Sequence, residues 1–119
     1  MKVEDLKILK NLKIGDVIYT TFFVYANYSN TKYWEYNYVS IFKKMLGTEI
    51  ITFATFDLKD NVWINNDNYL GDAQEVEYQR FGTEEEKNML FDIMRKRGYL
   101  WDSKKGIVRK IKSLDIKGI

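Results

Sequence analysis

The stretch from Val17 to Phe81 most strongly limits what this chain can fold into, because it is a succession of β-branched and aromatic runs separated by short polar turns. The first run, Val17–Tyr25, is β-branched or aromatic throughout, which is typical of a strand. Further strands are expected over residues 33–45, 49–58, 62–64 and 75–81, with a bend near residues 43–44 and a loop over 65–72. The sequence therefore predicts about five short strands in succession.

The second of these runs alternates with a period of two, so that its two faces can be distinguished. Trp34, Tyr36, Tyr38 and Phe42 share one face, and the residues between them share the other. The first run carries apolar residues on both of its faces, which indicates a strand that is covered on both sides.

A helix is predicted over residues 83–97, because several local signals agree. Thr83 and Glu86 have the spacing of a capping box, and three glutamates in the first turn and three basic residues in the last turn complement the helix dipole. Gly98 stands where a left-handed cap ends a helix. A polar loop between the apolar runs that follow predicts a β-hairpin over residues 99–111.

The predicted fold class is α+β: a bent antiparallel sheet or small SH3-like barrel of about five strands, covered by one C-terminal helix and followed by a β-hairpin. The segment at residues 12–18 resembles the opening of SH3-like barrels. A short helix is expected over residues 1–12 from its apolar spacing, and the tail at 112–119 is expected to be partly disordered. No linker or repeat divides the chain, so one domain over residues 1–119 is predicted.

The chain contains neither histidine nor cysteine, which makes catalysis an unfavoured interpretation. These residues supply the commonest general base, the strongest nucleophile and the usual transition-metal ligands. Their absence excludes disulfides and thiolate zinc sites, although carboxylate chemistry stays possible. No catalytic residue, cofactor or metal site is predicted. The first residues do not form a signal peptide and no stretch has the ~18 apolar residues of a membrane span, so a cytoplasmic location without membrane contact is expected.

An aromatic stripe is the first candidate binding surface. Trp34, Tyr36 and Tyr38, with Tyr28 nearby, would form a partner-binding site if their face of the sheet is exposed. The same rings could stack on nucleic-acid bases or simply fill the core. Apolar residues on both faces of several strands exceed what one helix can cover, which suggests a second buried surface such as a homodimer.

Charge is distributed unevenly and gives an alternative site. Residues 57–92 carry ten acidic and three basic residues, whereas residues 95–117 carry nine basic and two acidic residues. The acidic segment could mimic a nucleic acid, and the basic end could bind phosphates. Both could equally be ordinary solvated faces, since the net charge is only +2. The candidate nucleic-acid-binding residues are Arg95, Arg97, Lys104, Lys105, Arg109 and Lys110.

Four short motifs stand out between Phe81 and Ile111: Phe81-Gly82-Thr83-Glu84-Glu85-Glu86-Lys87, Leu90-Phe91, Gly98-Tyr99-Leu100-Trp101-Asp102 and Val108-Arg109-Lys110-Ile111. In these motifs the region resembles a recurrent C-terminal module of small uncharacterised phage and prophage proteins of gut Bacteroidetes and related bacteria. Gly82 departs from the alanine that is usual there, and the first 80 residues show no such likeness. The resemblance implies a phage or mobile-element origin, and hence a module that binds a host or phage protein, such as an inhibitor of a bacterial anti-phage defence protein.

Overall fold

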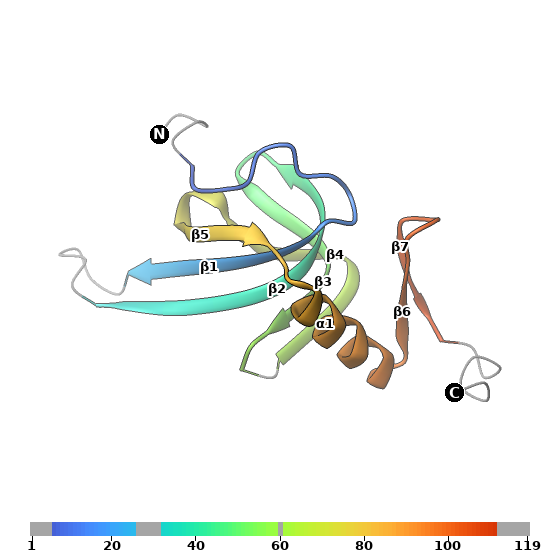
Figure 1. Ribbon diagram of the computed structural model, residues 1–119. Helices are drawn as coiled ribbons and strands as arrows, with labels where there is room; N and C mark the ends of the chain where they lie inside the picture. Colours follow the sequence, from blue (N-terminus) through green and yellow to red (C-terminus); the bar gives the residue numbers. More distant parts are fainter. Residues whose placement is uncertain (1–5, 26–31, 60, 112–119) are drawn as a thin grey trace.

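The protein is built around one five-stranded antiparallel sheet (Figure 1). The computed structural model describes residues 6–25, 32–59 and 61–111. The strand order is β4-β3-β2-β1-β5, with antiparallel pairing between all neighbours. The strands are β1 (Val17–Tyr25), β2 (Tyr33–Leu46), β3 (Glu49–Asp57), β4 (Asn61–Asp72) and β5 (Val76–Phe81).

The sheet is strongly bent because its long strands carry bulges. The β2–β3 pairing shifts register between Ile41 and Lys44, at the bend that the sequence predicts, and the β3–β4 pairing shifts between Thr52 and Ala54. Bulges increase local twist and bend a strand. After β4 a short 3₁₀ turn, η2 (Ala73–Glu75), leads the chain back to the free edge of β1.

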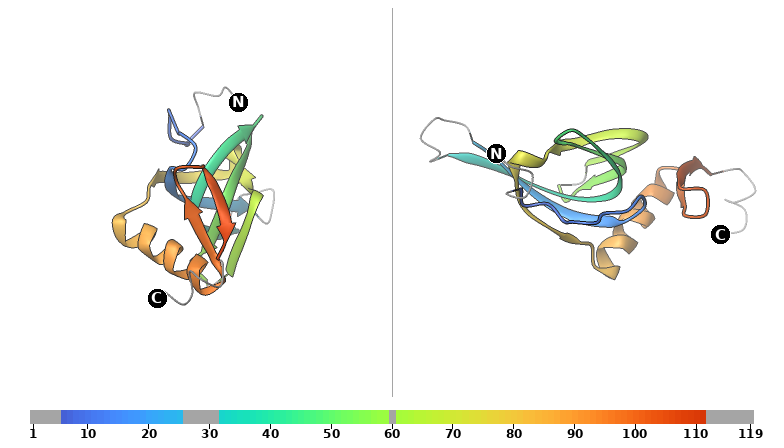
Figure 2. Two further views of the ribbon diagram at one scale, coloured as in Figure 1. Left: turned by 90° about the vertical axis from the view of Figure 1, so that its right-hand side faces the viewer. Right: turned by 90° about the horizontal axis from the view of Figure 1, so that it is seen from above.

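One close approach shows how far the sheet curls. Strands β1 and β4 are separated by two other strands in the sheet order. Nevertheless, a Cβ atom added to Gly71 of β4 would lie 2.6 Å from two ring carbons of Phe22 in β1. The end of β4 therefore faces β1 across the concave side of the sheet, and the curl is visible in Figure 2. Among the described residues no ladder joins β4 to β5, so backbone pairing does not close this half-barrel.

Apolar clusters cover both faces of the sheet, as predicted from the apolar residues on both faces of β1. One cluster lies under the helix and hairpin, and the other fills the concave side, where the segment before β1 also packs. The buried members of the first are Val17, Val39, Ile41, Phe53, Ala54, Phe56, Leu90 and Met94. Those of the second are Ile18, Phe22, Phe42, Ile50, Ala73 and Val76.

The C-terminal helix and hairpin are confirmed. Helix α1 (Glu84–Lys96) begins at the N-cap Thr83 with both hydrogen bonds of the capping box, and Gly98 follows it with a φ of 89°. Strands β6 (Tyr99–Asp102) and β7 (Ile107–Lys110) form a separate two-stranded sheet at the end of the helix (Figure 1). The hairpin is held to the main sheet partly by Trp101, whose ring centroid lies 4.9 Å from that of Phe53.

The helix expected over residues 1–12 is wrong for its described part, residues 6–12, which form an irregular segment. Asn11 has a φ of 62°, which a right-handed helix does not accommodate, and the backbone N–H of Leu9 donates to Oε1 of Gln79 at 2.7 Å. The apolar side chains of this segment pack against the concave cluster one by one instead of forming a helical stripe. They are Leu6, Ile8, Leu9 and Leu12.

The loop expected over residues 65–72 is also wrong, because β4 continues to Asp72. Thr52 pairs with Asn68 and Ala54 with Ile64, so residues 65–67 form an insertion opposite a single residue of β3. The polar Asn- and Asp-rich composition therefore marks a bulge within a strand and not a loop between strands.

The expected tail at residues 112–119 lies outside the described residues. The described part of the chain contains no helix with the length and hydrophobicity that a membrane crossing requires.

Candidate functional site

The aromatic stripe lies on the concave face of the sheet, in the alternation that the sequence predicts. Trp34, Tyr36 and Tyr38 of β2 pair with Val24, Phe22 and Thr20 of β1. Tyr36 and Tyr38 are half-buried against the concave cluster, and their rings are parallel to within 2°, with centroids 6.3 Å apart. Trp34 is 57% exposed. The stripe therefore passes from core to surface along the strand.

The exposed end of the stripe belongs to a two-stranded ribbon. β1 and β2 run out beyond the rest of the sheet, and their last pairs are Val24 with Trp34 and Tyr25 with Tyr33 (Figure 1). Tyr25 is 47% and Tyr33 48% exposed. The Tyr33 ring stacks on Phe23 at 4.3 Å and meets Tyr25 edge-on at 5.8 Å. We call Tyr25, Tyr33 and Trp34 the aromatic end of the ribbon.

Tyr28, the fourth residue of the predicted partner-binding site, lies outside the described residues.

A groove adjoins the stripe on the concave face, between β2 and the end of β4. It consists of two adjoining hollows of about 200 Å³ and 180 Å³ that share Tyr38, Tyr69 and Leu70. We call it the β2–β4 groove. Its first hollow is completed by Thr55 and Asn68, and its second by Phe22, Val24, Tyr36, Gly71, Asp72 and Glu75.

Carboxylates surround the phenols of this groove. The pKa of Tyr69 is raised by partial burial and by the negative charges of Asp72, Glu49 and Glu75. The pKa of Tyr38 is raised by burial, and further by Asp57 and Tyr36. Both phenols therefore stay neutral at physiological pH, and the charged side chains that raise each pKa are carboxylates.

Sequence reasoning did not identify the β4 side of this groove, because it placed residues 65–72 in a loop. The only signal was the apolar pair Tyr69-Leu70 within an otherwise polar stretch.

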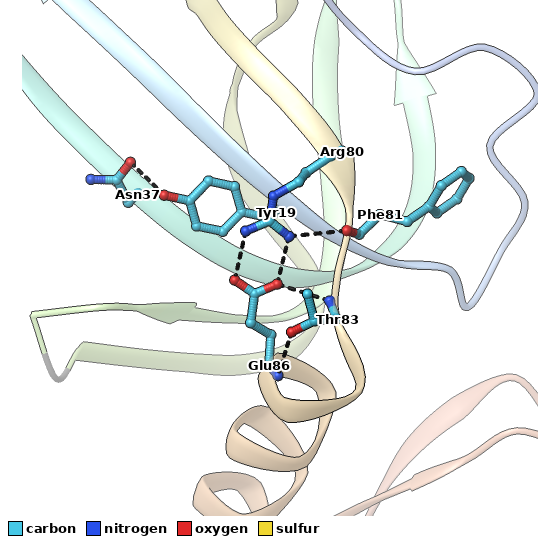
Figure 3. Close-up of polar contacts among 6 residues, drawn as sticks. All are labelled: Tyr19, Asn37, Arg80, Phe81, Thr83 and Glu86. Carbon is cyan, nitrogen blue, oxygen red and sulfur yellow. Dashed lines mark hydrogen bonds and ion pairs between the residues drawn. The ribbon is translucent and has the colours of Figure 1, made fainter.

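A second polar cluster, around Arg80, joins the helix to the opposite face of the sheet (Figure 3). Nη1 and Nη2 of Arg80 donate to the two carboxylate oxygens of Glu86 at 2.7 and 2.9 Å. The guanidinium carbon also lies 4.2 Å from the ring centroid of Tyr19, whose hydroxyl donates to Asn37 at 3.0 Å. Each of these charges is partnered within the protein, so the cluster acts as a structural link.

Replacing Glu86 with glutamine is expected to lower the free energy of unfolding by about 1–2 kcal/mol near neutral pH, since glutamine preserves the capping box but removes the charge opposite Arg80. Arg80 lowers the pKa of Glu86 below its ordinary value. The stabilisation is therefore complete above the pKa of the unfolded state, about 4.3, and is lost as the pH falls through the lower folded pKa. Denaturant titrations at several pH values measure the difference.

The matched control is Glu85→Gln, which removes one negative charge from the same helical turn at an exposed position. If Glu85→Gln destabilises as much as Glu86→Gln, the effect belongs to the helix dipole and not to Arg80.

The basic residues of the alternative site belong to three parts of the fold: the end of α1, the hairpin turn and strand β7. Arg95 pairs with Asp92 at 2.8 Å, and Arg97 is the C-cap of the helix. Lys104 and Lys105 lie in the hairpin turn, where their backbone N–H groups donate to Asp102. Arg109 and Lys110 are consecutive in β7, so their side chains point to opposite faces. Strand β6 separates this turn from the end of the helix, so the charges lie at both ends of the hairpin.

The described residues contain no group of three or more acidic side chains placed to hold a metal ion.

Fold and site together define a small α+β protein with an exposed aromatic ribbon end and an adjoining acidic, aromatic groove. Comparisons with models of known protein families, with curated proteins and with solved structures found no match to this chain.

Proposed function

We propose that this protein is a protein-binding module that acts by binding and not by catalysis, and that its contact surface is the aromatic end of the β1–β2 ribbon. The observation that carries the proposal is the exposure of three large aromatic side chains at a protruding position, with Tyr25 and Tyr33 paired on one face of the ribbon and Trp34 on the other. Large aromatic side chains are enriched in protein interfaces and among the residues that contribute most to affinity. On the Trp34 face of the ribbon, Tyr36 and Tyr38 extend this surface into the groove.

The regular pairing of the ribbon supports the same function. An unbroken β1–β2 register runs from Val17 paired with Ile41 to Tyr25 paired with Tyr33. The rings of Phe23 and Tyr25 contact Tyr33 and thereby limit its side-chain freedom. A surface that is ordered before binding loses less conformational entropy when a partner binds.

A narrower form of the proposal follows from the resemblance of residues 81–111 to a phage and prophage module. On this reading the partner is a host or phage protein in the bacterial cytoplasm, and the module inhibits an anti-phage defence protein by covering part of its surface. A second copy of the chain is the alternative partner of the same surface.

Nucleic-acid binding by the basic helix end and hairpin receives less support. The six candidate residues are spread over the end of α1, the hairpin turn and both faces of β7, whereas phosphate recognition needs cations that follow a backbone.

Affinity capture of the tagged protein from bacterial lysate, with and without nuclease, tests the proposal. We expect a protein in stoichiometric amount that survives nuclease treatment and is identified by mass spectrometry. Recovery of nucleic acid, or of proteins that are lost after nuclease treatment, would instead support the basic hairpin as the binding site. Capture of neither would contradict both functions in that host.

A further inference from the structure

The β2–β4 groove is narrow and suits one extended side chain. Its two adjoining hollows are only about 200 and 180 Å³, so the groove as a whole lies at the small end of the roughly 300–1,000 Å³ range of small-molecule sites. The groove continues along the same strand face as the exposed Trp34, since residues 34, 36 and 38 alternate along β2 at about 7 Å per pair of residues. A partner that contacts Trp34 can therefore reach the groove with one side chain.

The walls of the groove are suited to an apolar stem. Tyr38 and Leu70 are half-buried, and Tyr69 stands 59% exposed on the β4 side. These phenol rings and the leucine offer an apolar channel of the kind that the methylene stem of a lysine or arginine contacts.

The floor of the groove is polar but already satisfied. The Thr55 hydroxyl donates to Ser40 at 3.2 Å and shares a hydrogen bond with Thr52 at 2.8 Å. No buried side-chain polar atom among the described residues lacks a partner. Selectivity of the groove therefore depends on its aromatic walls and its charged rim.

The rim carries negative charge. Asp72 and Glu75 line the second hollow, and no lysine or arginine is among the described residues that line either hollow. Asp72 accepts hydrogen bonds from Thr48 and from the backbone of Gln74, which fixes its position. A cation above a tyrosine ring and beside these carboxylates gains from both, whereas an anion would be repelled.

We infer that the β2–β4 groove binds a lysine or arginine side chain of the partner protein, with its stem between Tyr38, Tyr69 and Leu70 and its cation at the Asp72–Glu75 rim. This inference rests on the proposed function, because it names the chemistry of the partner. On this inference the groove determines which partner is bound, and the aromatic end provides most of the contact area with that partner.

Amide-resolved NMR titration of the intact chain tests the inference with two short probes. These are the capped pentapeptide Gly-Gly-Lys-Gly-Gly and the same peptide with norleucine in place of lysine, which keeps the stem but lacks the charge. We expect shift changes at Thr55, Asn68 and Tyr69 with the lysine peptide, and binding at least about threefold weaker for norleucine. Equal binding of both peptides, or shifts confined to other surfaces, would overturn the inference.

Two matched pairs of variants locate the effect. Tyr69→Leu and Glu75→Gln, both at exposed positions of the groove, are expected to weaken lysine-peptide binding by about threefold or more. Tyr78→Leu and Glu85→Gln remove an exposed ring and an exposed charge elsewhere and should leave it unchanged. The amide spectrum of each variant verifies its fold. Loss of binding in the control variants as well would contradict the assignment to the groove.

Further measurements distinguish a failure of this inference from a failure of the proposed function. Spermidine is a further probe in the same titration. If spermidine changes the amide shifts of the groove residues while the lysine peptide does not, the groove is a site for small free polyamines and the inference is overturned. If the Trp34→Ala variant loses the captured partner while Tyr69→Leu and Glu75→Gln retain it, the inference is rejected and the proposed function still holds. Lysine-selective shifts without any captured protein would support the groove chemistry and count against the proposed function.

Discussion

Replacing Leu90 with alanine is expected to lower the free energy of unfolding by about 2–5 kcal/mol. Leu90 is 0% exposed and lies with Met94 in the cluster that joins α1 to β2 and β3. Truncation removes buried apolar area and leaves a cavity between a helix and a sheet, which relax only partly. Denaturant titration measures the change as a lower midpoint at an unchanged slope.

Met89→Ala is the control, because Met89 precedes Leu90 in the same helix but is 39% exposed. We expect it to change the free energy of unfolding by less than about 0.5–1 kcal/mol. A larger loss for Met89→Ala than for Leu90→Ala would mean that the helix presents a different face to the sheet.

Gly71→Ala is expected to destabilise the protein by about 1–3 kcal/mol, as overpacking does in a tight core. The new Cβ would lie 2.6 Å from the Phe22 ring, a contact that real Cβ atoms do not make. Phe22 is buried and its ring packs edge-on against Tyr38 at 5.8 Å, so it cannot move away without disturbing the floor of the half-barrel.

A double-mutant cycle with Phe22→Leu identifies the cause. Leucine lacks the outer ring atoms that approach Gly71, so Gly71→Ala should cost clearly less in that background than in the wild type. Additive free energies of unfolding would contradict the approach of β4 to β1 across the concave face, and with it the existence of the groove.

The sequence predicts the elements whose signals are local. The helix at 84–96 follows from the capping box of Thr83 and Glu86 and from Gly98, all of which act within one or two turns. The faces of β2 likewise follow from alternation, because successive side chains of a strand point to opposite faces.

The two wrong elements were decided by contacts distant in sequence. The segment before β1 is held by Gln79, some 70 residues away, in a conformation that its own apolar spacing does not specify. Similarly, residues 65–72 remain a strand because β3 pairs with them across a bulge. Propensity describes only the local preference, and tertiary pairing overrides it.

The candidate site was predictable only in part for the same reason. The aromatic stripe could be identified from Trp34, Tyr36 and Tyr38, but whether it was buried depended on where the sheet curls. The groove required Tyr69 to lie opposite Tyr38, which the bulges in β2 and β4 bring about. No local sequence pattern predicts that these two tyrosines lie on opposite sides of one groove.

Quantitative affinity capture with two variants tests most directly whether the aromatic end is the binding surface. Trp34→Ala truncates an exposed ring, so it should leave the free energy of unfolding within about 1 kcal/mol of the wild type while weakening partner capture at least about tenfold. The double variant Lys104→Ala/Lys105→Ala, in the exposed hairpin turn, should capture the partner as well as the wild type does. Full capture by Trp34→Ala together with loss in the hairpin variant would contradict the proposed surface and assign binding to the basic hairpin.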